Sequence, residues 1–125
     1  MIVGIGIDSV EIERVDELVR KFGERARDRV FTPREIELAG SGAGAASTLA
    51  ARFAAKEAAM KALGTGWAEG VAFVDVEIDR DAGGAPRLTL HRAAAARAAA
   101  LGAARFHVSL THARTFASAV VVLES

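Results

Sequence analysis

The chain has 125 residues, with 16 basic and 16 acidic side chains and no cysteine. A chain of this length removes roughly two-thirds of its surface from water on folding, enough for one hydrophobic core, so we expect a single domain over residues 1–125. The net charge of zero gives no general attraction to nucleic acid or to an anionic membrane, so a charged partner must be recognised by a local patch. The lack of cysteine excludes disulfides, thiolate metal sites and thiol catalysis.

The N-terminal segment has none of the features of an export signal. Residues 1–8 contain no basic side chain and no small-residue cleavage site. No part of the sequence approaches the roughly 20 apolar residues of a membrane span. The sequence therefore predicts a cytoplasmic protein.

The first elements predicted are a strand and a helix. Residues 2–7 are apolar and mostly β-branched, with two glycines, which favours a buried strand. Asp8 or Ser9 can then cap a helix that begins at Val10, where apolar residues start to recur at helical spacing. Gly23 marks the expected end of this helix.

A second helix and a loop follow. Thr32 precedes a proline and, three positions on, a glutamate, and this combination predicts a helix start with a capping box. The helix is expected to stop near Gly40. Residues 40–47 contain only glycine, alanine and serine, which predicts a mobile surface loop.

The longest helical pattern occupies the middle of the chain. It begins at Ser47 or Thr48, either of which can act as an N-cap, and runs to about Leu63, where Gly64 supplies a left-handed closing residue. Apolar residues at positions 49, 53, 60 and 63 form one stripe of this helix. Lys56 falls inside that stripe, so it must extend to water, form a pair or serve a function.

The second half of the chain predicts two strand pairs around a short helix. Residues 74–79 alternate apolar and acidic side chains, and after a Gly-Gly turn residues 87–90 form the returning strand. Residues 91–101 are alanine-rich and predict a helix. Residues 106–111 and 116–123 form the last pair of strands. Strands at both ends and in the middle predict an α+β fold with a mainly antiparallel sheet packed with helices.

Single residues with chemical potential also have ordinary structural interpretations. Asp8 can be a helix N-cap, and Glu57 and Lys61, four residues apart, can be a surface ion pair. A lone histidine such as His112 can lie in the core or at a sheet edge. The G-x-G of residues 4–6 only weakly suggests a dinucleotide-binding turn, because the third glycine is missing. None of these signals decides the function alone.

Three motifs taken in order do indicate a family. The first is G-I-G-I-D at residues 4–8, with Arg14 six residues later. The second is R-F-A-A-K-E-A-A-M-K-A at 52–62, which runs into G-T-G at 64–66, and the third is V-S-L-T-H at 108–112. Over essentially its whole length the chain resembles the holo-acyl-carrier-protein synthases, the small branch of the 4′-phosphopantetheinyl transferases. The resemblance implies the fold of that family and a homotrimer with active sites at the subunit interfaces.

The resemblance also implies an activity. Such an enzyme transfers the 4′-phosphopantetheine group from coenzyme A to a serine hydroxyl of an apo acyl carrier protein, releases adenosine 3′,5′-bisphosphate, and supports fatty acid or polyketide biosynthesis. It implies coenzyme A and the carrier protein as partners, with no nucleic acid and no membrane. It further implies Mg²⁺, or alternatively Mn²⁺, bound by Asp8 and Glu57, whose hard oxygen ligands suit such a cation.

Individual roles follow from the same resemblance. Lys61 would stabilise or protonate the departing phosphate, and Glu57 would accept the proton of the serine, directly or by way of a water. Arg52, His112 and Lys61 would contact the phosphates of the coenzyme. The turn of Gly64, Thr65 and Gly66 would let backbone N–H groups approach the nucleotide.

Arg14 matches the family pattern and is the predicted docking residue for the acidic carrier protein. Six further basic residues lie between positions 20 and 34, but four acidic residues are interleaved between positions 14 and 34, so an ordinary solvated helix face stays an alternative. We expect this docking surface to be separate from the metal cleft. Two alternative functions also stay open, a binding module without turnover and a purely structural trimer.

Overall fold

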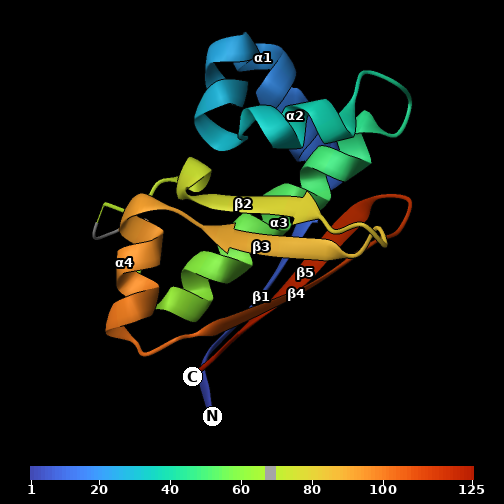
Figure 1. Ribbon diagram of the computed structural model, residues 1–125. Helices are drawn as coiled ribbons and strands as arrows, with labels where there is room; N and C mark the ends of the chain where they lie inside the picture. Colours follow the sequence, from blue (N-terminus) through green and yellow to red (C-terminus); the bar gives the residue numbers. More distant parts are fainter. Residues whose placement is uncertain (67–69) are drawn as a thin grey trace.

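The computed structural model describes residues 1–66 and 70–125. One long helix, α3 (Ala45–Leu63), lies at the centre of the molecule (Figure 1). A three-stranded sheet packs on one side of α3 and a two-stranded hairpin covers another side, with helices at both ends. Among the described helices, none combines the length and the apolar composition that a membrane crossing requires.

The three-stranded sheet is antiparallel and has the order β1 (Ile2–Glu11), β5 (Phe116–Glu124), β4 (Arg105–His112). Its inner face packs on α3 through alternate residues of β5, of which Val121 and Leu123 are fully buried. The predicted α+β architecture with antiparallel strands is therefore confirmed.

The two-stranded hairpin consists of β2 (Val76–Arg80) and β3 (Pro86–Leu90), and α4 (Arg92–Ala100) follows it. The strand predicted from residue 74 starts later, because residues 73–75 form a short 3₁₀ helix, η1 (Phe73–Asp75). The carboxylate of Asp75 accepts hydrogen bonds from the backbone N–H of Ala72 at 3.0 Å and from Nε of Arg92 at 2.7 Å. These contacts stabilise the 3₁₀ turn of residues 73–75, so these residues do not join β2.

Helix α1 (Ile12–Val30) does not begin where the sequence predicted. Residues 8–11 pair with β5 instead, so β1 continues to Glu11 and neither Asp8 nor Ser9 caps a helix. Gly23 was correctly identified as a break, since its φ of 70° interrupts the helical conformation. Helix α1 continues beyond this kink to Val30.

Helix α2 (Pro33–Ala39) confirms the predicted capping box. The backbone N–H of Glu35 donates to Thr32 Oγ1 at 3.3 Å, and the backbone N–H of Thr32 donates to Glu35 Oε1 at 2.8 Å. Gly40, with a φ of 66°, ends the helix as expected.

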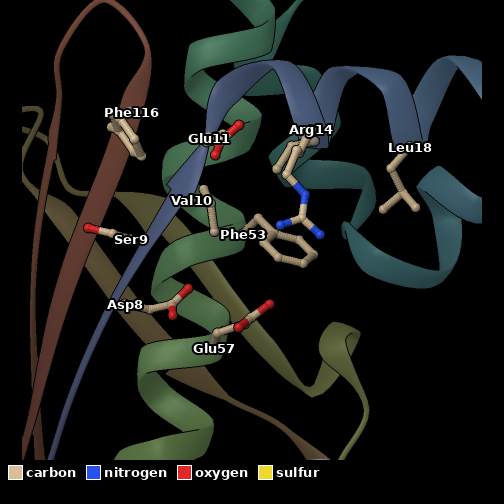
Figure 2. Close-up of a pocket in the computed structure, with 10 residues that line it drawn as sticks. Asp8, Ser9, Val10, Glu11, Arg14, Leu18, Phe53, Glu57 and Phe116 are labelled. Carbon is tan, nitrogen blue, oxygen red and sulfur yellow. The ribbon is translucent and has the colours of Figure 1, made fainter.

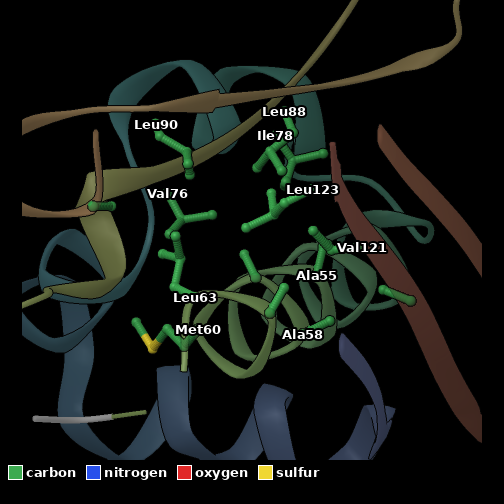
Figure 3. Packing of buried hydrophobic residues seen from close by; sticks show 14 of the residues in the cluster. Ala55, Ala58, Met60, Leu63, Val76, Ile78, Leu88, Leu90, Val121 and Leu123 are labelled. Atoms are coloured by element: carbon green, nitrogen blue, oxygen red, sulfur yellow. The ribbon is translucent and has the colours of Figure 1, made fainter. Parts of the chain in front are cut away.

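Helix α3 starts earlier than predicted, at Ala45, so Ser47 and Thr48 lie in its first turn rather than at its cap. Ser47 Oγ donates to the carbonyl of Gly44 at 3.1 Å. The predicted end at Gly64 is confirmed by its left-handed φ of 76°. Instead of one apolar stripe, α3 buries most of its circumference, because the hairpin and the sheet both pack on it and its many alanines allow close approach (Figure 3).

The two glycines of β1 bring this strand directly against α3. A Cβ on Gly6 would lie 1.9 Å from the carbonyl oxygen of Ala58, and one on Gly4 would lie 2.2 Å from that of Ala62. Real Cβ atoms do not approach other atoms so closely, so only glycine fits at these positions. The G-x-G pattern is therefore a strand-to-helix packing motif, and it places Asp8, the next residue on this face of β1, over the C-terminal half of α3.

Candidate active site

A cavity of about 470 Å³ opens between β1, α1 and α3. Asp8 of β1, Glu57 of α3 and Arg14 of α1 line it (Figure 2). The carboxylates of Asp8 and Glu57 point toward the same space, although the two residues lie far apart in sequence. The structure thus brings together the two predicted metal ligands.

Lys61, one helical turn after Glu57, also lies beside Asp8. Its Nζ donates to Asp8 Oδ1 at 3.1 Å and to the carbonyl oxygen of Ile7 at 3.0 Å. The side chain of Asp8 is 12% exposed and that of Lys61 is 55% exposed, so the pair lies at the mouth of the cleft. The three residues predicted to carry the chemistry therefore form one cluster.

The electrostatics of this cluster favour a cation. Burial raises the pKa of Glu57, the nearby charge of Asp8 raises it further, and Lys61 opposes the shift. Asp8 Oδ2 is buried and has no hydrogen-bond partner among residues 1–66 and 70–125. Two neighbouring carboxylates with an unsatisfied oxygen suit a hard divalent cation.

The residues present fit a magnesium ion only if other ligands complete its shell. In the part of the chain that the structure describes, no group of three or more histidine, aspartate and glutamate side chains could hold a metal. Mg²⁺ commonly uses one or two carboxylates and takes its remaining ligands from waters and substrate phosphates. Asp8 and Glu57 meet that requirement.

Arg52 and His112 lie in a different cavity of the same chain. This second cavity has a volume of about 210 Å³ and lies between α3, the hairpin and β4, and Arg80 also lines it. Arg52 is 2% exposed, and its Nε and Nη2 atoms have no partner within the described segments. Burial lowers the pKa of Arg52, and the neighbouring Arg80 lowers it further, against the charges of Glu35 and Asp79. Unpaired, buried guanidinium N–H groups attract an anion.

Arg80 was missed by sequence reasoning. It lies at the end of β2, and no local spacing relates it to Arg52 or His112. Phe53, which lines the first cavity, was assigned only to the apolar stripe of its helix. Its position four residues before Glu57, on the same side of a helix, is the signal that could have placed it in the cleft.

The turn of Gly64, Thr65 and Gly66 uses its backbone N–H groups to end α3. They donate to the carbonyl oxygen of Lys61 at 3.1 Å and to that of Met60 at 3.3 and 3.5 Å. Nucleotide binding through these N–H groups stays a prediction, and it would require the bonds to open.

Arg14 lines the same cavity as Asp8 and Glu57. We had expected the docking surface and the metal cleft to be separate. The structure instead places Arg14, the predicted docking residue, in the wall of the cleft, because α1 begins directly after β1 and crosses the end of the cleft (Figure 2).

Comparison with known proteins agrees with this geometry. Residues 4–120 match the sequence pattern of the 4′-phosphopantetheinyl transferase superfamily. The chain is 52% identical over 125 residues to the holo-[acyl-carrier-protein] synthase of Nitratidesulfovibrio vulgaris, covering 100% of both chains.

Solved structures give the same result. The holo-[acyl-carrier-protein] synthase of Neisseria meningitidis has a TM-score of 0.89 and 36% identity, covering 100% of both chains. The corresponding synthase of Bacillus anthracis, in complex with CoA (3′,5′-ADP), has a TM-score of 0.81 and 38% identity, covering 100% of this chain and 98% of the other. With this agreement in sequence, fold and clustered carboxylates, the chain belongs to the 4′-phosphopantetheinyl transferase superfamily.

Proposed function

We propose that this protein is a holo-acyl-carrier-protein synthase, which transfers 4′-phosphopantetheine from coenzyme A to a serine hydroxyl of an apo acyl carrier protein. The observation that carries the proposal is the pair of Asp8 and Glu57 in one cleft, with Lys61 bonded to Asp8, in a chain that is about half identical to such synthases. A binding module without turnover would not need a paired carboxylate site with a lysine beside it. We also infer that residues 1–125 act as one transferase domain in fatty acid or polyketide biosynthesis, in the cytoplasm.

The chemistry follows from these side chains. The serine oxygen attacks the phosphorus that carries the pantetheine, the bond from that phosphorus to the bridging oxygen breaks, and adenosine 3′,5′-bisphosphate leaves. Asp8 and Glu57 would hold Mg²⁺, or Mn²⁺, which when bound neutralises charge on the pyrophosphate. Glu57, with its raised pKa, is suited to accept the serine proton. Lys61 is placed to donate to the departing phosphate.

The direct test is mass spectrometry of an apo carrier protein incubated with this protein, coenzyme A and Mg²⁺. We expect the carrier to gain the mass of one phosphopantetheine group, and to gain nothing when EDTA removes the metal. Coenzyme A binding without any mass gain would instead indicate the binding module, and no metal-dependent coenzyme A binding at all would indicate the structural trimer.

We infer that the active site is completed by a second copy of the chain. The buried guanidinium of Arg52, together with Arg80 and His112, suits a phosphate of the coenzyme, but these residues line a cavity other than that of Asp8 and Glu57. A neighbouring subunit can supply the second set. The outer face of the three-stranded sheet is the candidate contact, since Ile5 and Ile7 are 65% and 67% exposed there.

Ile7→Lys is therefore expected to dissociate a homotrimer, because it places a charge in the centre of an apolar contact. Sedimentation velocity should give a trimer for the wild type and monomers for this variant. Phe22→Lys provides the control, since Phe22 is similarly exposed, at 59%, but lies on α1, and this variant should remain trimeric. A wild-type monomer with full activity would rule the trimer out.

Arg14→Glu is expected to raise the KM for the carrier protein and to leave the KM for coenzyme A nearly unchanged. Charge pairs at the rim of an interface act mainly on association and are screened over about 8 Å at physiological salt. Added salt should therefore weaken the wild type more than the variant in steady-state kinetics. Arg87→Glu makes the same charge change at an exposed position on β3 and should affect neither KM.

Because Arg14 lines the cleft, the KM for coenzyme A is the decisive measurement. If the KM values for the carrier protein and for coenzyme A rise equally, Arg14 binds coenzyme A and is not specific to carrier docking. If Arg14→Glu does not change the KM for the carrier protein at low salt, the basic residues of α1 are an ordinary solvated helix face and not a docking surface.

A further inference from the structure

Lys56, the residue before Glu57, points into the core instead of the cleft. It is 0% exposed, and its ammonium group meets three acceptors. Nζ lies 2.7 Å from Glu35 Oε1 and donates to the carbonyl oxygen of Phe73 at 3.0 Å and to that of Val76. The full donor capacity of the lysine is thus used.

Glu35 is equally buried and equally well satisfied. Its Oε1 accepts from the backbone N–H of Thr32 at 2.8 Å, and its Oε2 accepts from the backbone N–H of Ile78 at 2.9 Å. The carboxylate therefore closes the capping box of α2 and simultaneously binds the edge of β2. Through this pair, α3 is joined by directional bonds to α2, η1 and β2.

Stability alone does not account for this arrangement. Removing both charges from water is costly, and burial lowers the pKa of Lys56 even though Glu35 raises it. An apolar pair of similar volume commonly gives equal or greater stability than a buried ion pair. What apolar contacts do not provide is direction, since they tolerate rotation and sliding of a helix.

On the opposite side of α3, toward β1, directional contacts come from the exposed Lys61, which donates to Ile7 and Asp8, and the remaining packing is less directional. There α3 meets β1 through alanines and glycines, with Gly4 and Gly6 against the carbonyl groups of Ala62 and Ala58. A surface without side-chain interdigitation fixes the distance between two elements better than it fixes the rotation of the helix.

The ion pair is also connected to the wall of the cleft. Phe73, whose carbonyl accepts from Lys56, stacks on Phe53 with ring centroids 5.3 Å apart. Phe53 lines the cavity beside Glu57. Because successive helical residues differ by about 100° in direction, the rotation that seats Lys56 in its three bonds also sets the direction of Glu57.

We propose that Lys56, through its ion pair with Glu35, is a positioning residue for the transfer reaction. It fixes the rotation and register of α3, and with them the placement of Glu57 relative to Asp8. The inference rests on the proposed function, because the carboxylates it places are those assigned to the metal and the proton.

The test is the double variant Lys56→Met/Glu35→Gln, which removes both charges together and leaves no unpaired buried ion. We expect kcat to fall roughly 100-fold, since small misplacement of reacting groups has effects of this size. Calorimetry should show binding of Mg²⁺ weakened about 10-fold, and the KM for the carrier protein should stay within about twofold. The calorimetric measurement reports on the carboxylates without requiring turnover.

The matched control is Leu88→Ala, which opens a cavity in the hairpin without touching the ion pair. Both variants are assayed well below their midpoints of thermal unfolding. The positioning role is supported if Leu88→Ala keeps the wild-type kcat and Mg²⁺ binding while the double variant loses both. Wild-type values in the double variant, or equal losses in the control, overturn it.

Glu35→Gln alone serves if the double variant does not fold. It keeps Lys56 and its two carbonyl bonds, so a folded protein with reduced kcat and weakened Mg²⁺ binding supports the proposal, and unchanged values overturn it. The wild-type arm separates this inference from the proposed function. If the wild type transfers nothing, the function is wrong; if it is active and the variants match it, only the positioning role is wrong.

Discussion

Replacing Asp8 or Glu57 by alanine is expected to abolish transfer while the protein remains folded. Each substitution removes one of the two proposed metal-binding carboxylates in the cleft and deletes little core volume, since neither side chain belongs to the hydrophobic clusters. We expect kcat/KM to fall at least about 1,000-fold, the upper range for loss of one electrostatic group in an active site. The measurement is carrier-protein modification followed by mass spectrometry, with circular dichroism melting curves to check the fold.

The control for this experiment is Glu37→Ala. It removes an exposed carboxylate on α2 that pairs with Arg34 at the surface, at 3.1 Å, and activity should be unchanged. Near-normal turnover in either cleft variant would end the two-carboxylate proposal.

Gly6→Ala is expected to produce the largest loss of stability. The added Cβ would sit 1.9 Å from the carbonyl oxygen of Ala58, and neither atom can swing aside, because the oxygen belongs to the backbone and the Cβ is bonded directly to it. β1 must therefore move away from α3. This movement is opposed by the pairing of Gly6 with Val121 of β5, which is itself fully buried. We expect the free energy of unfolding, measured in urea, to fall by roughly 3 kcal/mol.

Gly42→Ala is the matched control. Gly42 lies in the exposed segment before α3, and a Cβ there would meet nothing within 4 Å. Its free energy of unfolding should change by no more than about 0.5 kcal/mol. A Gly6→Ala protein as stable as the wild type would show that β1 does not lie against α3.

The elements that were predicted correctly are those determined by neighbouring residues. The capping box at Thr32 and the left-handed end at Gly64 are local, and so is the Gly-Gly turn of the hairpin. The errors occur where distant residues decide. β1 continues to Glu11 because β5 pairs with it, and η1 forms where Asp75 is held by Arg92, 17 residues later.

The candidate site, like the fold, was predicted only in part from the sequence. The resemblance identified Asp8, Glu57 and Lys61, and the fold brings them together. It could not show that Arg52 and His112 line another cavity, because motif order carries no information about which sides of α3 face which strands. The proposed completion of the site by a second subunit depends on contacts between chains, which motif order within one chain does not encode.

For Lys56, the sequence indicated an unusual role but did not identify its partner. Its position inside an apolar stripe indicated that it must extend to water, pair or serve a function. Its partner was not recognised, because Glu35 already had a complete local explanation as the glutamate of a capping box. A carboxylate has two oxygens, and only the three-dimensional structure shows that Glu35 uses them for different elements.

The contact between β1 and α3 has a consequence for engineering. Since backbone meets backbone at Gly4 and Gly6, the separation of the two elements that carry Asp8 and Glu57 is set by main-chain atoms. Substitutions that change side-chain volume elsewhere leave this separation alone. A designer seeking a more heat-resistant enzyme can therefore redesign the apolar residues between α3 and the hairpin, provided that Lys56 and Glu35 are kept, without readjusting the catalytic cleft.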